Sequence, residues 1–409
     1  MSQNINTEYN SFITSMLNKI SHLNKWRRDF IIEVLCLFLS IKGRINFLQL
    51  GRYGKHGEQQ YRQQFEKDFD FLSFNKEIVL SKGSGKFAIA FDPSYIAKAG
   101  KSTYGLDKYW SGCAQKAKWG LEISGLAAVD IENHTAFHLE AVQTPNGEML
   151  DDQSINLLDW YAKIITDRVA TLILLSKYLV ADAYFSKKPF IDKMTLAGLF
   201  SISRLRSDSY LRYLYKGEKT GKRGRPKKYG GKINIKELDL NYFEKIEQNN
   251  EYTLYCAIVN SKALKRDIKL VVMEQINEKQ KKSYYLYFST DLEMDGKQIY
   301  EFYHNRFQIE FLYRDGKQFT GLNDCQARSE NKLKFHFNSS LTSINVAKVI
   351  HWLSIDKEQR ESFSMSDIKT MNHNILLLER FFDVFAIDPN SIKNPDIIKE
   401  LINYGRIAA

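Results

Sequence analysis

The chain has 409 residues, of which 44% are hydrophobic, and a formal net charge of +11. This composition excludes a disordered protein, is sufficient for two or three domains with a buried core, and favours a polyanionic partner. No apolar run is long enough to span a bilayer, the N-terminus lacks the apolar core of a signal peptide, and the cysteines lack zinc-ligand spacing. We therefore expect a cytoplasmic protein without a membrane partner.

Residues 1–80 are predicted to form a helical region. Apolar residues recur at helical spacing over residues 9–17 and 30–39, and a basic stretch at residues 43–55 leads to a polar helix at 59–69. Helices joined by basic turns suit a DNA-binding region. A solvated helical cap without a DNA partner is an equally good interpretation of these residues.

The apolar pattern then changes to that of strands. Residues 87–91 predict a strand that ends at Asp92 and Pro93, because proline cannot donate to a strand ladder. Residues 121–130 and 135–142 predict two further strands joined as a hairpin.

The next segment predicts a crossover between two strands of one sheet. Asp151 and Asp152 can begin an amphipathic helix that runs to about residue 175. Residues 178–182 then predict a buried strand with Asp182 at its end. Strand, hairpin, helix and strand together imply an α/β fold with a mixed sheet and a right-handed crossover.

The remainder is predicted to hold a β-rich insertion and then helices. Short β-like runs alternate with lysine-rich connections up to about residue 283, and Asp291 or Asp295 can cap the helix that follows. The chain is predicted to be helical after Phe335. The chain is thus predicted to begin with a helical DNA-binding region (residues 1–80). A catalytic core follows in two parts (residues 81–200 and 284–350), separated by a β-rich insertion (residues 201–283). A helical C-terminal region (residues 351–409) ends the prediction.

Three acidic residues could form a metal site. Asp92 and Asp182 each end a predicted strand, and Glu310 lies on a predicted helix over residues 303–317. Two Mg²⁺ ions ~3.5–4 Å apart need shared hard oxygen ligands of this kind, and such ions clamp the attacking and leaving oxygens of phosphoryl transfer. For either aspartate alone, a turn or helix cap is the more frequent role.

One face of this helix combines a carboxylate with two cations and a phenol. At ~100° per residue, Tyr303, Arg306, Glu310 and Lys317 lie within about 60° of one another. The cations and the phenol can hold phosphate oxygens beside a metal that the carboxylate binds. The alternative is a solvated face with local ion pairs, and Gly316 weakens the helix just before Lys317.

The spacing Tyr303-x2-Arg306-x3-Glu310-x6-Lys317 resembles the Tyr-Arg-Glu-Lys signature of a group of bacterial insertion-sequence transposases with a DDE active site. The two aspartates that precede it, with their strand contexts, are also similar to the pattern of that family. The resemblance covers about residues 86–345. It implies an RNase H-like catalytic core that is interrupted by a β-rich insertion between the second aspartate and the glutamate.

The resemblance also implies roles for individual residues and partners. The metal ligands for two Mg²⁺ or Mn²⁺ ions per active site would be Asp92, Asp182 and Glu310. The contacts to phosphates near the transposon end would come from Tyr303, Arg306 and Lys317. The implied partners are double-stranded DNA, as transposon ends and as target, and a second copy of the chain, because paired cleavage and joining require two active sites.

The reaction that the resemblance implies has two steps. Water attacks a DNA phosphodiester in line, and the freed 3′-OH then attacks target DNA. Some members of the family pass through a DNA hairpin at the transposon end. Such a protein is expected to be cytoplasmic and associated with the bacterial nucleoid.

A basic segment at residues 219–228 holds six cations in ten residues. The run from Arg223 through Arg225 to Pro226 resembles the core of an AT-hook, which lays arginines in an A·T-rich minor groove. We therefore assign DNA contacts to Arg223, Arg225 and Lys227. The alternative is a flexible charged loop, which could contact phosphates without sequence preference.

Residues that follow Asp92 could also lie on the path of DNA. Ser94 and Lys98 carry groups that suit phosphate oxygens. Trp110 and Trp119 are expected to pack in the core, and the alternative for them is stacking on an extruded base.

Three functions are consistent with these residues. A DDE transposase is the leading hypothesis. An RNase H-like, metal-dependent nuclease without strand transfer is the second. A DNA-binding protein that has lost catalysis is the third, and the presence of all three carboxylates disfavours it.

Overall fold

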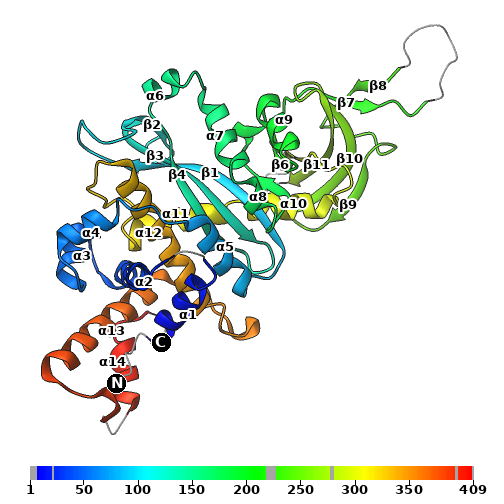
Figure 1. Ribbon diagram of the computed structural model, residues 1–409. Helices are drawn as coiled ribbons and strands as arrows, with labels where there is room; N and C mark the ends of the chain where they lie inside the picture. The colour runs from blue at the N-terminus through cyan, green and yellow to red at the C-terminus, as the bar shows by residue number, and fades with distance from the viewer. Residues whose placement is uncertain (1–6, 21–22, 218–226, 277–280, 392–394, 408–409) are drawn as a thin grey trace.

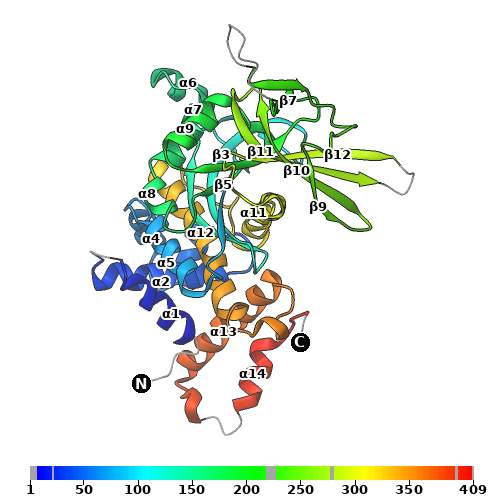
Figure 2. The same cartoon turned by 90° about the vertical axis from the view of Figure 1, so that its right-hand side faces the viewer.

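The computed structural model describes residues 7–20, 23–217, 227–276, 281–391 and 395–407. Within these residues, a 12-stranded mixed sheet is the centre of the molecule, and the predicted α/β fold class is confirmed. Figure 1 shows the sheet in the upper half and a helical region below it, where both termini lie, and Figure 2 shows the same division from the side. No helix among the described residues is long and apolar enough to cross a membrane.

The N-terminal region is helical, as predicted. Its elements are α1 (Thr7–Leu17), α2 (Lys25–Ser40), α3 (Phe47–Tyr53), α4 (Glu58–Gln64) and α5 (Phe71–Lys82). Local sequence explains where several of them begin, because Asn24, Asn46 and Asp70 each accept a hydrogen bond from the backbone N–H three residues later. Helix α2 buries Phe30 and Phe38 in the core that it shares with the C-terminal helices.

The first part of the sheet has both parallel and antiparallel pairs. Its strands are β1 (Phe87–Ala97), β2 (Asp107–Ser111), β3 (Lys116–Asp130), β4 (Thr135–Gln143), β5 (Tyr178–Val180) and β6 (Phe200–Leu205). Strand β3 is antiparallel to β1, β2 and β4, and β5 is parallel to β1 and β6. The hairpin predicted around residues 131–134 is the β3–β4 connection.

The prediction that the first strand ends at Asp92 and Pro93 is wrong, because β1 continues to Ala97. Strand β5 pairs with β1 only at Ile89 and Ala90, so the later part of β1 has β3 as its strand partner. A proline is tolerated where one side of a strand has no ladder to complete, because its missing N–H removes no hydrogen bond there.

The crossover is not the single helix that was predicted from Asp151. It consists of α6 (Gly147–Asp152), α7 (Leu157–Thr166) and α8 (Val169–Leu172), and α9 (Lys188–Leu196) follows β5. Asn146 and Asn156 cap α6 and α7. Ser154 has a φ of 52°, a left-handed conformation that ends one helix before the next begins.

The strands of the predicted insertion extend the same sheet. Residues 201–283 hold most of β6, together with β7 (Leu211–Leu214), β8 (Tyr229–Lys232), β9 (Glu244–Gln248), β10 (Tyr252–Ser261) and β11 (Arg266–Ile276), and β12 (Lys282–Ser289) is the strand predicted to follow the insertion. Strand β12 pairs with β6, and the order continues through β11, β10, β7 and β8, while β9 also pairs with β10. Figure 1 shows β7 and β8 farthest from the termini.

The segment predicted as one helix over residues 303–317 is two helices, α10 (Gly296–Asn305) and α11 (Gln308–Phe319). Asp295 caps α10, in agreement with one of the two predicted caps. The break lies at Arg306 and Phe307, where the backbone bonds of Arg306 and Glu310 reach back three residues instead of four.

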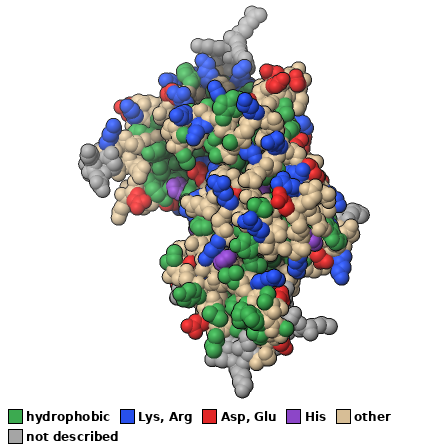
Figure 3. All heavy atoms as spheres, turned by 90° about the vertical axis from the view of Figure 1, so that its left-hand side faces the viewer, with side chains coloured by type: hydrophobic (Ala, Val, Ile, Leu, Met, Phe, Trp, Pro, Cys, Tyr) green, Lys and Arg blue, Asp and Glu red, His purple; other side chains and the backbone are tan. Residues whose placement is uncertain are grey.

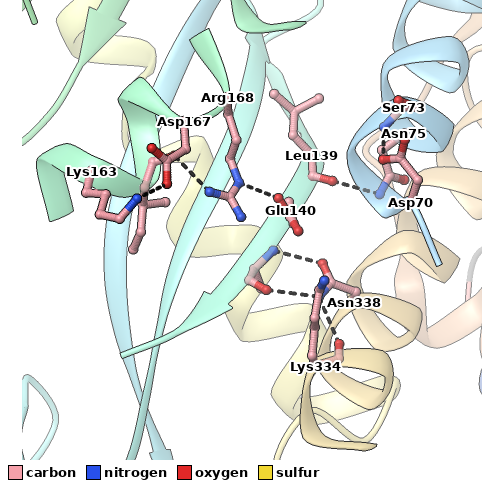
Figure 4. A network of polar contacts seen from close by, with 12 residues as sticks. Asp70, Ser73, Asn75, Leu139, Glu140, Lys163, Asp167, Arg168, Lys334 and Asn338 are labelled. Atoms are coloured by element: carbon pink, nitrogen blue, oxygen red, sulfur yellow. Dashed lines mark hydrogen bonds and ion pairs between the residues drawn. The ribbon is translucent and has the colours of Figure 1, made fainter. Parts of the chain in front are cut away.

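The C-terminal region is helical, as predicted, and consists of α12 (Glu330–His351), α13 (Met365–Phe385) and α14 (Pro395–Asn403), with short 3₁₀ turns at Lys357–Gln359 and Pro389–Ser391. Helix α12 is buried over most of its length between the sheet and the other helices. Two of its asparagines, Asn338 and Asn345, bond to the backbone of β4, and Figure 4 shows the first of them. These amides take the place of a further strand beside β4.

Candidate active site

Asp92 lies within β1, and Asp182 lies just past the end of β5, the strand that pairs with β1 in parallel. Strands β1 and β5 are paired at Ala90 and Val180, and each aspartate follows its paired residue by two positions. Paired strands are about 4.8 Å apart. The sheet therefore brings together two acidic residues that are distant in the sequence.

The Asp92 carboxyl is partly buried, and its ionisation is unfavourable. Burial is the main cause that raises its pKa to about 7; Arg306 opposes the rise, and the carboxylates of Asp182 and Glu310 reinforce it. An added cation among these groups would favour the charged form of Asp92.

A close contact between α11 and the sheet positions the backbone of Asp92. The Tyr313 hydroxyl donates to the Asp92 carbonyl oxygen at 2.6 Å. Gly125 pairs with Asp92 on β3, and a Cβ at Gly125 would lie 2.0 Å from the Tyr313 hydroxyl oxygen. Any side chain at position 125 would therefore push Tyr313 and α11 away from the site.

Asp182 is held at the start of the short 3₁₀ turn Ala183–Phe185. One of its carboxylate oxygens accepts from the backbone N–H of Tyr184 at 2.8 Å, and its carbonyl oxygen accepts from the Ser203 hydroxyl at 2.8 Å. The second carboxylate oxygen is available for another partner, because the bond from Tyr184 uses only the first. Both the cap and the strand end are local features that the sequence pattern predicts.

Arg306 lies between two of the carboxylates. Its Nη2 atom donates to Glu310 Oε1 at 2.8 Å, and its Nη1 atom lies 3.7 Å from Asp92 Oδ1. Burial lowers the pKa of Arg306, but Asp92 and the other neighbouring anionic groups outweigh burial and raise it. The break between α10 and α11 falls at this arginine, so its guanidinium is directed into the acidic cluster.

Tyr303 and Lys317 flank the cluster from α10 and α11. The Tyr303 ring lies 5.0 Å from the Tyr287 ring, and burial raises the pKa of Tyr303. Lys317 donates to the Ser94 hydroxyl at 3.0 Å, and burial lowers its pKa. Ser94 is two residues beyond Asp92 on β1, so Lys317 lies beside the site, as predicted.

Gly316 does not mark a frayed helix end. Helix α11 continues through it to Phe319. The glycine is buried against α12, where a Cβ would lie 2.9 Å from Leu341 Cδ2. The glycine thus permits close helix packing and keeps Lys317 in a regular turn of α11.

Among the residues that the structure describes, no group of three His, Cys, Asp or Glu side chains is close enough together to hold a metal ion. The donor set of Asp92, Asp182 and Glu310 nevertheless fits a hard divalent cation, because it consists of carboxylate oxygens. The raised pKa of Asp92 is consistent with that fit. The Glu310 side chain is 55% exposed, so it can change rotamer without disturbing the core.

The predicted AT-hook falls largely outside the described residues. Arg223 and Arg225 lie in the segment that the structure does not describe, so their contacts stay a prediction. Lys227 is exposed, and its ammonium lies 5.0 Å from the centre of the Tyr215 ring.

Two residues near the site were missed at the level of sequence. Tyr313 lies three residues after Glu310, so helical spacing could have indicated it. Glu122 is buried on β3, accepts hydrogen bonds from Tyr161 at 2.6 Å and from Thr144 at 2.9 Å, and is among the groups that raise the pKa of Asp92. Its sequence context carries no signal, because its proximity depends on strand register.

Two expectations for residues after Asp92 are wrong. Lys98 donates to the carbonyl oxygens of Cys325 and Ala327, so it holds a loop in place instead of facing outward. Trp110 and Trp119 are not in the core: they are 61% and 59% exposed. Both lie on the part of the β2–β3 hairpin that extends beyond the end of β1.

Comparison with known proteins identifies a domain. Residues 161–346 match the family of the transposase DDE domain. The matched segment includes Asp182 and Glu310 and begins after Asp92. The match supports the predicted resemblance to insertion-sequence DDE transposases, without distinguishing the Tyr-Arg-Glu-Lys group among them, and with the mixed sheet it supports the RNase H-like fold class. No curated protein matches the chain.

Proposed function

We propose that this protein, of which residues 161–346 match the transposase DDE domain, binds the terminal inverted repeats of an insertion sequence, hydrolyses DNA at their ends and joins the 3′-OH to target DNA. The observation that carries the proposal is that Arg306 lies between Asp92 and Glu310, while the pairing of β1 with β5 brings Asp182 next to Asp92. The spacing of Tyr303, Arg306, Glu310 and Lys317 is the further support, and on it we propose that the chain belongs to the Tyr-Arg-Glu-Lys group.

The three carboxylates would hold two Mg²⁺ or Mn²⁺ ions, which when bound lower the pKa of an attacking water and stabilise the leaving oxygen. Carboxylates suit this role because they supply several hard oxygen donors to one place. Asp182 would offer the oxygen that its cap leaves available. Glu310, exposed on α11, would turn toward the aspartates.

Arg306 would change partners as DNA binds. Its guanidinium now lies between Asp92 and Glu310, where it offsets two negative charges. Once cations offset those charges, the guanidinium would be free to form bidentate bonds with a phosphate. Lys317 and Tyr303 would hold other phosphate oxygens, with Ser94 positioning the Lys317 ammonium.

The assay that tests the function uses purified protein, a labelled duplex that contains the terminal repeat, and Mg²⁺ or Mn²⁺. Cleavage at the repeat end followed by strand joining is the expected result. Cleavage without joining would support the RNase H-like nuclease, and binding without cleavage would support the non-catalytic protein. Short inverted repeats in the DNA that flanks the gene would supply the substrate sequence.

Metal binding should be detectable without catalysis. At a Mg²⁺ concentration about ten times the dissociation constant, binding should stabilise the fold by ~1.4 kcal/mol and raise the melting temperature. Asp182→Asn should lose this Mg²⁺ response, because it removes a charged ligand while its amide oxygen can still accept from Tyr184. Calorimetry with NaCl at matched ionic strength is the control. An equal Mg²⁺ shift in both proteins would rule out Asp182 as a ligand.

The basic segment would add contacts to DNA phosphates. Replacing Arg223 and Arg225 with glutamine should make the slope of log K against log salt shallower by about 1.8, because each phosphate contact contributes about 0.9. Lys163 and Lys188 are matched controls, since each is ion-paired on its own helix. An unchanged slope in the arginine variant, measured by fluorescence anisotropy, would show that the segment does not touch DNA.

The number of protein copies in the DNA complex is a separate part of the proposal. We propose a homodimer in the DNA complex, because cleavage and joining of two ends require two active sites. Sedimentation of the protein with and without the repeat duplex measures the stoichiometry directly.

A further inference from the structure

The β2–β3 hairpin presents two exposed indole rings. Trp110 is 61% and Trp119 is 59% exposed, although tryptophan side chains are usually well buried and dominate binding surfaces when they are not. The hairpin lies at the left of Figure 1. Figure 3, which views the molecule from that side, shows lysine and arginine side chains spread over much of the upper part of the face.

Strand register places the two rings on the same face. Trp110 pairs with Ala117 and Lys108 pairs with Trp119, so Lys108, Trp110 and Trp119 project to one side of the ribbon. The Lys108 ammonium lies 5.9 Å from the centre of the Trp119 ring. We call these three residues the indole face.

The charges around the indole face favour an anion. Lys108 supplies the positive charge on this face, whereas Lys116 and Lys118, which are also exposed, project to the opposite side of the ribbon. The nearby carboxylate of Asp107 is engaged with backbone, because it accepts from the N–H groups of Lys108 at 2.7 Å and Gly147 at 2.8 Å. Two indole rings beside the Lys108 ammonium offer both an apolar surface and a positive charge to a ligand.

Contacts below the indole face hold it in place. The Tyr95 hydroxyl donates to the Trp119 carbonyl oxygen at 2.7 Å. Gly120 allows this approach, because a Cβ there would lie 2.5 Å from the Tyr95 ring. The buried Tyr109 hydroxyl lies within 3.1 Å of the Thr144 and Pro145 carbonyl oxygens. The rings therefore extend from an anchored ribbon, which limits the entropy lost when a ligand binds.

The hairpin is connected to the candidate active site through β1. Strand β1 carries Asp92 and, a few residues later, Ser94 and Tyr95. Ser94 accepts a hydrogen bond from Lys317, and Tyr95 donates one to the hairpin. Cys113, in the turn of the hairpin, is close enough to Lys317 to influence its pKa. A DNA strand that leaves the acidic cluster along β1 would reach the indole face.

We propose that the indole face of Lys108, Trp110 and Trp119 binds unpaired nucleotides of DNA, with bases stacked on the two indoles and a phosphate held by Lys108. Aromatic rings can stack only on bases that are not enclosed in a duplex, whereas the cations accept any backbone. The inference rests on the proposed function for its location beside DNA, and it assigns to that function a second site that distinguishes unpaired from paired DNA.

The test compares two labelled DNAs without divalent metal: a fully paired duplex, and the same duplex with a short single-stranded gap. Wild-type protein should bind the gapped DNA more tightly. Trp110→Ala and Trp119→Ala should each weaken binding to gapped DNA by about 10-fold and leave binding to the duplex unchanged, because stacking on one ring is worth ~1–3 kcal/mol. Trp119→Phe should restore part of the loss. Tyr404→Ala, an exposed aromatic in the C-terminal region, is the matched control.

The outcomes separate this inference from the proposed function. Equal affinity of the tryptophan variants and wild type for gapped DNA overturns the inference, even if wild type cleaves and joins DNA. Equal losses on gapped and paired DNA also overturn it, since the hairpin would then contact the backbone alone. Selective losses on gapped DNA support it, even if the protein proves unable to cleave.

Discussion

Replacing Glu310 with glutamine is expected to reduce DNA cleavage by about 10³-fold or more, equivalent to ~4 kcal/mol of transition-state stabilisation, while DNA binding persists. Glutamine keeps an oxygen that can accept from Arg306 but removes the charge that a divalent cation requires. The fold should be unaffected, because the Glu310 side chain is 55% exposed and its pair with Arg306 is of the i, i+4 kind, which contributes little to stability.

The measurement is single-turnover cleavage of the terminal-repeat duplex alongside a gel-shift assay of binding. Glu301→Gln is the matched control: Glu301 lies on α10 and forms an ion pair with Lys86 at 2.9 Å. Full cleavage by the Glu310 variant would remove this residue from the site. An equal loss in the Glu301 variant would mean that any charge change on these helices disturbs the reaction.

The three carboxylates should also behave as one unit. Asp182→Asn combined with Glu310→Gln should be little worse than either single variant, because losing one ligand already disables the shared site. Losses that multiply would indicate independent roles for the two residues.

Asn345→Leu is expected to destabilise the protein by about 3 kcal/mol or more. Strand β4 is an edge strand, and the Asn345 amide bonds both backbone groups of His138: its Oδ1 accepts from the N–H at 2.8 Å and its Nδ2 donates to the carbonyl at 2.7 Å. The amide also donates to Asn75 Oδ1 at 2.9 Å. Leucine leaves these buried groups unpaired, at ~1–3 kcal/mol for each.

Asn338→Leu should have a similar effect, because Asn338 lies two helical turns earlier and bonds the N–H and C=O of Ala141 at 2.8 and 2.9 Å, as Figure 4 shows. The measurement is urea denaturation followed by circular dichroism. Asn331→Leu is the control, since Asn331 is exposed in the first turn of α12. Equal denaturation midpoints for the Asn345 and Asn331 variants would show that β4 does not depend on these amides.

Much of the local structure could be predicted because it depends on residues close together in the chain. The apolar alternation over residues 121–142 is that of a hairpin, and Asp295 caps α10 as its position suggests. The sequence also shows that Asp92 and Asp182 each follow an apolar run, which predicted a strand before each of them. The same patterns did not show where helices end. A single helix was predicted in the segment that forms α6 and α7, and another in the segment that forms α10 and α11.

The sequence predicted which residues form the site, but it did not predict how their side chains are arranged. Helical periodicity puts Arg306 and Glu310 on one face, but the break at Arg306 is what directs the guanidinium toward Asp92. Tyr313 reaches the backbone of Asp92 because position 125 on another strand is glycine. The sequence of α11 cannot show that the residue facing Tyr313 on β3 is a glycine.

Local sequence was therefore enough to specify the class of fold, the cap of α10 at Asp295 and the candidate acidic residues of the site. Tertiary contacts decided the rest: the pairing of β1 with β5 that aligns Asp92 with Asp182, the asparagines of α12 that complete the edge of β4, and the exposure of Trp110 and Trp119. The physical reason is that propensity and periodicity act over a few residues. Strand register, close packing and exposure are set by segments that meet only when the whole chain has folded.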